Sequence, residues 1–197
     1  MKQIEKAMII KKRRLASTDT KELQQKRQKF LEWLILRDNL KVLEMYSTNG
    51  DVIKSRPQVP QYMHEYKFCN TRKQIKSETC AETDKLEHDQ SIEFICDIIK
   101  ELIKKRIHFA VFYAQGQRSP HIRIYDFEQM EELKPHQRMK ARGQFWRSII
   151  PFRVHLLDQA LWTDDHYICL EFSIHWKYGT PFELLFEWLP QEEKCKN

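Results

Sequence analysis

HFAVFYAQGQRSPHIRIYDF, residues 108–127, is the stretch that decides the fold of this chain. It opens with a largely apolar run, continues through a turn that contains Gly116, and then alternates polar and apolar residues from position 121 to position 125. Strict alternation is the period of a strand with one face toward solvent. We therefore predict an antiparallel hairpin over residues 108–127. The side chains expected on one wet face are Ser119, His121, Arg123 and Tyr125.

That face carries a hydroxyl, an imidazole and a guanidinium, all of which donate hydrogen bonds to anions. A second segment has the same character, because Ser173-Ile-His175 is followed by Lys177 and Gly179. An ammonium, an imidazole and the backbone N–H of a glycine turn can together contact a phosphate chain. The two segments predict a single basic cleft for a nucleotide or a nucleic acid, into which His121 and His175 both open.

Helical patterns precede the hairpin. Leu23, Phe30 and Leu34 recur at helical spacing after a possible Thr cap, which predicts a helix from about residue 20 to 45. A stripe of isoleucines and leucines predicts a second, amphipathic helix over residues 91–105, on which the hairpin packs. Between them, residues 62–68 suggest a short strand, and residues 70–90 are almost wholly polar. We expect residues 70–90 to form a surface loop or an insertion.

Downstream of the hairpin, residues 127–150 are expected to form one or two helices broken at Pro135. Residues 166–189 predict two strands around a turn at residues 177–180. The expected fold class is mixed α/β of the α+β type, with antiparallel strands packed on helices. A basic N-terminal helical extension, residues 1–50, which includes the KKRR run at 11–14, precedes a core domain of residues 51–197.

Composition limits the class of protein. The chain has 197 residues, 41% of them hydrophobic, with 34 Lys and Arg against 28 Asp and Glu, a formal net charge of +6. A basic balance suits a polyanionic partner. The five cysteines form no CxxC pair, no P-loop or GxGxxG is present, and no apolar stretch approaches the roughly 20 residues of a membrane span. We expect a soluble, cytoplasmic protein without a membrane partner.

The hairpin and the later His-Lys-Gly segment resemble those of a known protein family. The hairpin VFYAQGQRSPHIRIY is similar to the Ser-x-His signature of the archaeo-eukaryotic primases and primase-polymerases, and SIHWKYG resembles their Ser-Leu-His-x-Lys-x-Gly segment. The resemblance covers roughly residues 92–185. It implies a nucleotidyltransferase of DNA replication or repair that binds a nucleoside triphosphate and a single-stranded or primed template. It also implies a replication partner such as a helicase or a large primase subunit.

The resemblance also implies roles for individual residues. The expected nucleotide ligands are Arg118, Ser119, His121, His175 and Lys177. His121 would act in catalysis, and divalent metal, Mg²⁺ or Mn²⁺, would be the cofactor of an active enzyme. An arginine usual in the strand before Ser173 is replaced by Cys169.

The acidic residues match the family less closely. Family polymerases carry an Asp-x-Asp pair on a strand before the amphipathic helix, and no apolar strand upstream of Ser91 ends in one. Glu82-Thr83-Asp84 lies in polar sequence. From this segment we predict Asp84 as a metal ligand. For the third acid we predict Asp164 and Asp165 as catalytic metal ligands, with Asp158 as the second choice.

Three functions remain open from the sequence. The first is an active primase-polymerase, and the second is a non-catalytic nucleic-acid-binding module with a degenerate primase fold. A more distant third is a nuclease or RNA-processing enzyme with His121 as acid or base. Two carboxylates from residues 65–89 within metal-bridging distance of Asp164 or Asp165, beside His121, would favour the enzyme, whereas a cleft lined only by basic residues would favour the binding module.

Overall fold

The predicted hairpin is present in the computed structural model, which describes residues 20–38, 43–46, 52–56, 70–127, 130, 132–175 and 177–190. Strand β5 (Phe109–Ala114) pairs antiparallel with β6 (His121–Ile124), with Val111 opposite Ile122. Gly116 has a φ of 88°, a left-handed conformation that glycine adopts without steric cost. The turn between the strands therefore depends on this glycine.

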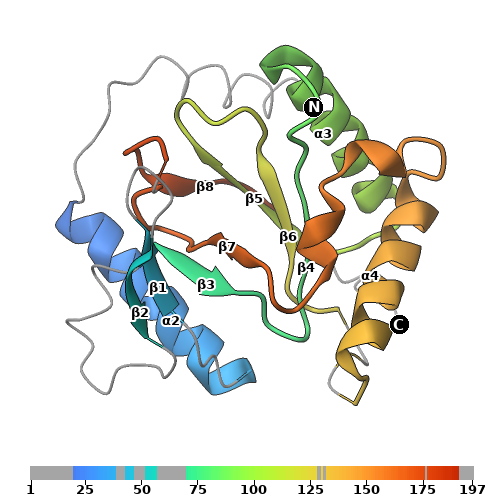
Figure 1. The fold of residues 1–197 in the computed structure, drawn as a ribbon. Helices are drawn as coiled ribbons and strands as arrows, with labels where there is room; N and C mark the ends of the chain where they lie inside the picture. Colours follow the sequence, from blue (N-terminus) through green and yellow to red (C-terminus); the bar gives the residue numbers. More distant parts are fainter. Residues whose placement is uncertain are drawn as a thin grey trace, which may run out of the picture.

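Around the hairpin, the described residues form three α-helices and two antiparallel sheets, which makes the fold mixed α/β (Figure 1). Sheet A has the order β2-β1-β3-β7, and sheet B has the order β4-β6-β5-β8. The helices are α2 (Lys21–Asp38), α3 (His88–Lys104) and α4 (Pro135–Ile149), with short 3-10 helices η2 (Val154–Leu156) and η3 (Gln159–Trp162). The remaining strands are β1 (Leu43–Tyr46), β2 (Val52–Arg56), β3 (Thr71–Lys73), β4 (Thr79–Ala81), β7 (Tyr167–Cys169) and β8 (Phe182–Trp188).

Sheet B separates two apolar cores. On one face, Val111 and Ile122 pack with the stripe of α3 that includes Ile95 and Ile99, and with Trp146 of α4. The prediction that the hairpin packs on helix 91–105 is confirmed, although α3 begins earlier, at His88. Figure 1 shows α3 and α4 on this side of the sheet, and α2 with sheet A on the other. Burial on both faces explains why every residue of β5 is buried.

The second core lies between sheet B and the N-terminal helix. Leu31 and Leu34 of α2 are 0% exposed and pack with Phe112 of β5 and Phe182 of β8. The helix ends at Asp38 rather than near residue 45, and residues 43–46 form strand β1 instead. A boundary at residue 50 therefore falls between β1 and β2, two paired strands of sheet A.

Residues 70–90 do not form a surface loop, so that prediction is wrong. The segment holds β3 and β4, in which all residues but one are buried, and supplies one strand to each sheet. Its polar residues can be buried because they are paired, both within the segment and with residues further along the chain. Arg72 donates to Glu78 at 2.7 Å and to Glu171 at 2.7 Å, and all three side chains are 0% exposed. Such pairs satisfy charges that would otherwise be costly to bury.

The polar face of β6 is also covered rather than wet. Arg123 is 0% exposed and lies near the same two glutamates, and the Tyr125 hydroxyl donates to Glu171 at 3.0 Å. Two arginines and two glutamates thus form a neutral buried group that joins sheet A to sheet B. Polar and apolar residues do alternate between the two faces, as predicted, but both faces are inside the protein.

The later elements match the sequence in part. Helix α4 is a single helix that starts at Pro135, where proline needs no hydrogen-bonded N–H. The strands expected around residues 177–180 are only partly paired with each other. β8 joins β5 in sheet B, β7 joins β3 in sheet A, and Ile174 forms a single bridge to Pro181. The predicted strand at 62–68 and the KKRR run lie outside the described residues.

Candidate functional site

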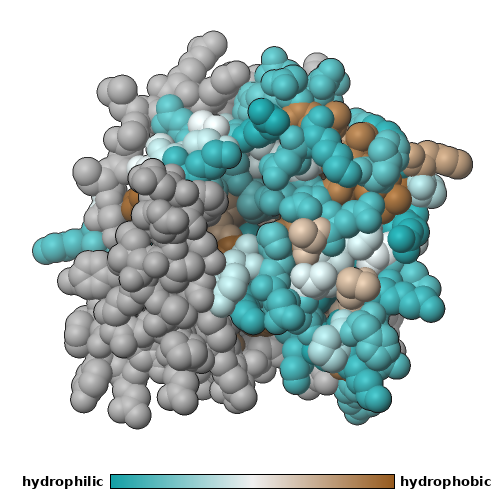
Figure 2. All heavy atoms as spheres, viewed as in Figure 1, coloured by the Kyte–Doolittle hydropathy of each residue, from teal (hydrophilic) through white to brown (hydrophobic). Residues whose placement is uncertain are grey.

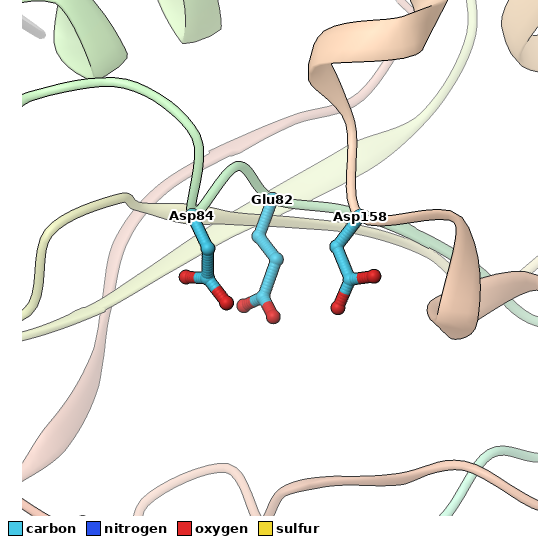
Figure 3. Close-up of side chains that lie close together, drawn as sticks. All are labelled: Glu82, Asp84 and Asp158. Carbon is cyan, nitrogen blue, oxygen red and sulfur yellow. The ribbon is translucent and has the colours of Figure 1, made fainter.

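Three carboxylates meet at the end of strand β4. Glu82 and Asp84 follow Ala81, the last residue of that strand, and Asp158 directly precedes η3. The backbone N–H of Asp158 donates to the carbonyl oxygen of Glu82 at 3.0 Å, which holds the two segments together. One oxygen from each carboxylate lies within 4.8 Å of the others. Figure 3 shows all three side chains pointing to the same side, with Glu82 between the two aspartates.

Glu82 and Asp84, for which no strand was predicted, therefore directly follow strand β4. β4 was missed because it is only three residues long and begins with Thr79, whose hydroxyl accepts a hydrogen bond from the Trp146 indole at 2.8 Å. A buried strand can contain polar residues whose hydrogen bonds are made inside the protein. Such a strand shows no apolar run by which the sequence could identify it. The sequence feature that could have identified this acid pair is the Glu-x-Asp spacing of residues 82 and 84.

Asp164 and Asp165 do not lie with Asp84, which corrects their assignment as the third acid. Asp164 accepts hydrogen bonds from Arg138 Nε at 2.8 Å and from Arg142 Nη1 at 2.7 Å. Asp165 pairs with Lys73 at 3.0 Å, and its side chain is 93% exposed. Neither aspartate lines the cavity described below. Asp158, the second choice, is the aspartate that lies beside Glu82 and Asp84.

A cavity of about 240 Å³ opens beside the three carboxylates. All five residues predicted to bind nucleotide lie on its wall, namely Arg118, Ser119, His121, His175 and Lys177. The wall also includes residues that were not predicted for this site, among them Glu82, His166 and Tyr178. His121 and His175 therefore share one cavity, as predicted. With Glu82, Asp84 and Asp158 in its wall, the cavity is lined by acids as well as by the predicted basic residues.

His121 connects the strand β6 to the acids. Its Nε2 contacts the Glu82 carboxylate and the Gln117 amide, and its Nδ1 lies 3.3 Å from Arg123 Nη2. The residue is 7% exposed, so the cavity reaches only one edge of the ring. Burial pushes the pKa of Glu82 upward, but the neighbouring His121 and Arg123 outweigh it and leave that pKa below its ordinary value. Glu82 is thus held ionised.

Asp84 is affected in the opposite direction. Burial, together with the negative charges of Glu82 and Asp158, raises its pKa above the ordinary value. The Arg118 guanidinium donates to the backbone oxygen of Asp84 at 3.0 Å rather than to its carboxylate. Like charges crowded in this way are a typical environment for a bound cation, because a cation removes the repulsion.

The Ser119 hydroxyl is used inside the protein. It accepts a hydrogen bond from the backbone N–H of Thr83 at 3.1 Å and donates to the Pro120 carbonyl at 3.1 Å. Thr83 is the residue between the two acids of the pair, so this hydroxyl ties the turn before β6 to the acidic loop. The geometry shows Ser119 supporting the acidic pair.

His175 and Lys177 lie on a tight turn at the other wall. The Lys177 N–H donates to His175 Nδ1 at 3.2 Å, and the Gly179 N–H donates to the His175 carbonyl at 2.8 Å. Burial lowers the pKa of His175 to about 3, with further lowering from His121 and Lys177. His175 is therefore neutral at pH 7 and offers a hydrogen bond, whereas the positive charge expected from this turn comes from Lys177 alone.

Trp146, Trp162 and Cys80 belong to the interior. Trp146 and Trp162 are 0% and 5% exposed. Cys80 is buried, its sulfur receives a hydrogen bond from Arg123 at 2.7 Å, and burial raises the pKa of its thiol to about 12. None of these three side chains lines the cavity.

No protein-family model, characterised protein or solved structure matches this chain. No helix among residues 20–38, 88–104 and 135–149 combines the length and apolar character needed to cross a membrane. On the face drawn in Figure 2, the surface of the described residues is mainly hydrophilic, with small apolar patches. The functional argument therefore depends on the geometry of the site itself.

Proposed function

We propose that this chain is a metal-dependent nucleotidyltransferase of the primase-polymerase type, acting on a nucleoside triphosphate and a nucleic-acid strand. The observation that carries the proposal is the group of Glu82, Asp84 and Asp158 in the same cavity as His121 and Lys177. The order along the chain also agrees with the family pattern, since an acid pair, a Ser-x-His strand and a third acid follow one another.

The three carboxylates suit divalent cations. Carboxylate oxygens are the ligands preferred by Mg²⁺ and Mn²⁺, and the three carboxylates converge within 4.8 Å of one another. A divalent cation held by these residues would neutralise the triphosphate and lower the barrier to attack on its α-phosphorus. Glu82 is ionised and oriented by His121, so it is prepared to act as a ligand.

The basic and neutral residues of the cavity suit the triphosphate. Lys177 and Arg118 supply positive charge at the cavity, and neutral His175 supplies a hydrogen bond. Cations and metal-binding acids around one cavity can orient the phosphates, and positioning with charge stabilisation is most of what phosphoryl transfer requires. His121 lies between the two walls and can contact a phosphate oxygen when Glu82 is engaged by a cation.

Primer extension with Mn²⁺ and Mg²⁺ tests the proposal. Loss of a charge-assisted contact through His121→Ala should reduce incorporation by on the order of a hundredfold, equivalent to about 2–3 kcal/mol. Asp158→Asn should abolish incorporation. Asp165→Asn is the matched control, because that side chain is 93% exposed and pairs with Lys73 at the surface, so activity should not change.

Full activity in His121→Ala or Asp158→Asn would overturn the assignment of the site. If the wild type incorporates no nucleotide with either metal, the non-catalytic nucleic-acid-binding module is the better description. Both functions predict affinity for single-stranded or primed nucleic acid that weakens steeply with salt, because Lys and Arg contacts release counterions. A titration at two salt concentrations measures this. The family's replication partners, a helicase or a large primase subunit, belong to the same proposal.

A further inference from the structure

The residues His175 and Lys177 sit at the tip of a short hairpin whose base is Phe172 and Phe182. The Phe172 N–H donates to the Phe182 carbonyl at 2.8 Å, and the Phe182 N–H donates to the Ser173 carbonyl at 2.8 Å. At the tip, the His175 N–H donates to the Thr180 carbonyl at 2.8 Å. Since the tip is short, the direction in which His175 enters the cavity depends on the conformation of the base.

That base contains an unfavourable backbone conformation. Phe172 has a φ of 60°, in the left-handed region where the Cβ of an L-residue meets its own backbone. Bulky residues adopt this region only where surrounding contacts require it. The residues that contact Phe172 therefore decide whether the hairpin holds its shape.

Helix α2 supplies two of those contacts. Arg27 Nη1 donates to the Phe172 carbonyl at 3.2 Å, and Arg27 is only 2% exposed. One helical turn later, the Phe30 ring meets the Phe172 ring edge-on at 5.8 Å between centroids. From the other side, Phe112 of β5 packs against Phe172 at 5.5 Å. Phe172 is thus held between the N-terminal helix and the central hairpin.

We infer that Arg27 and Phe30 of helix α2 are positioning residues for the cavity, which act by holding Phe172 in its left-handed conformation and so orient the hairpin that carries His175 and Lys177. Neither residue lines the cavity. The N-terminal helix is therefore an integral part of the site. Its consequence for nucleotide binding rests on the function proposed above, whereas its consequence for the hairpin does not.

Hydrogen exchange of the free protein tests the inference directly. Arg27→Met keeps the apolar length of the side chain but removes the donor to the Phe172 carbonyl. The amides of His175 and Gly179 should exchange at least about tenfold faster in this variant, because local opening of the hairpin becomes easier. The amide of Val111 in β5 should exchange as in the wild type, which shows that the fold is intact. Lys26→Met is the matched control, since Lys26 is exposed and pairs with Glu22.

Arg27→Lys retains a buried donor and should restore most of the protection. If Arg27→Met does not fold, Phe30→Leu provides the same test, because it keeps an apolar side chain and removes the ring contact. Unchanged exchange at His175 and Gly179 in a folded Arg27→Met or Phe30→Leu variant would overturn the inference. So would faster exchange in Lys26→Met to the same degree.

A second measurement separates this inference from the proposed function. In a primer-extension assay, Arg27→Met should raise the KM for the triphosphate by about tenfold and change kcat little, since a less ordered hairpin weakens ground-state binding. Faster exchange without any nucleotide-dependent activity in the wild type would refute the proposed function and leave the positioning role established. Normal exchange with an altered KM would refute the positioning role.

Discussion

Asp158 and Asp164 are six residues apart, and replacing each by Asn should change stability in opposite directions. Asp158 faces two other carboxylates within 4.8 Å, whereas Asp164 accepts hydrogen bonds from two arginines. Asparagine keeps the shape of both side chains, removes the charge and replaces one acceptor oxygen by an NH₂ donor. At Asp158 it also keeps the oxygen that accepts the Ala160 N–H at 3.0 Å, so the start of η3 is preserved.

The magnitude for Asp158 follows from Coulomb's law. Two unit charges 4.8 Å apart at an effective dielectric constant of about 20 repel by roughly 3 kcal/mol. Because Asp84 is exposed and Asp158 is half-buried, solvent and salt screen much of this. We expect Asp158→Asn to stabilise the metal-free protein by about 1–2 kcal/mol, which is about 3–6 °C in Tm for a chain of this size.

Asp164→Asn should instead destabilise the protein. Arg142 is 0% exposed and would lose the carboxylate that balances its charge. Breaking a buried pair from one side costs about 3–5 kcal/mol, and the 20% exposure of the Asp164 side chain reduces the expected loss to about 2–4 kcal/mol. The two variants therefore distinguish the acid proposed to bind metal from the acid that is paired with buried arginines.

Thermal and urea unfolding in EDTA and in Mn²⁺ measure both effects. Metal at a hundred times its Kd should stabilise the wild type and Asp164→Asn by about 2.7 kcal/mol, and should stabilise Asp158→Asn far less. The reasoning is refuted if Asp158→Asn is less stable than the wild type in EDTA, or if Mn²⁺ raises the Tm of both aspartate variants equally.

Three further predictions concern stability. Burial pushes the pKa of Asp164 upward, but the hydrogen bonds from its two arginines leave it below the ordinary 3.8. Its contribution is therefore complete above that pH and is lost as the pH falls through the lower folded-state pKa, so acid unfolding of Asp164→Asn should show a weaker pH dependence. Arg72→Met leaves two buried glutamates without their main partner and should cost at least about 3 kcal/mol in urea unfolding, and a neutral effect would contradict the buried charge network. Gly116→Ala should lower the free energy of unfolding by about 1–2 kcal/mol because the φ of this residue is 88°. A steric clash is not the cause, since the added Cβ would lie 3.5 Å from the Tyr178 ring. Calorimetry of the variant measures the change.

The local sequence pattern predicted those elements that show a strong hydrophobic periodicity or contain a turn-forming residue. The hairpin at residues 108–127 and helix α3 have patterns that few other structures satisfy, and Gly116 marks a turn that needs a positive φ. The resemblance to the primase-polymerases also led to five residues that all line the cavity. All of these features involve residues that are close together in the sequence, so the sequence alone is enough to recognise them.

Strands β3 and β4 could not be predicted in this way. They contain polar residues that are typical of the surface but find partners elsewhere in the chain, as Arg72 does in Glu171 across 99 positions and Thr79 does in Trp146. The same limit applies to the choice among Asp158, Asp164 and Asp165. An acid next to another acid can hold a cation, and an acid between two arginines cannot, but the sequence does not show which neighbours each carboxylate will have.

By itself, the sequence determined a mixed α/β chain with a Ser-x-His hairpin, an amphipathic helix beneath it and a second His-Lys-Gly turn. Only the tertiary structure decided which acids join them, that both faces of β6 are covered, and that helix α2 reaches Phe172. The physical reason is that periodicity reports burial of apolar surface, which is averaged over a segment. Charge pairing and backbone strain depend instead on individual contacts between distant residues, and these exist only once the chain has folded.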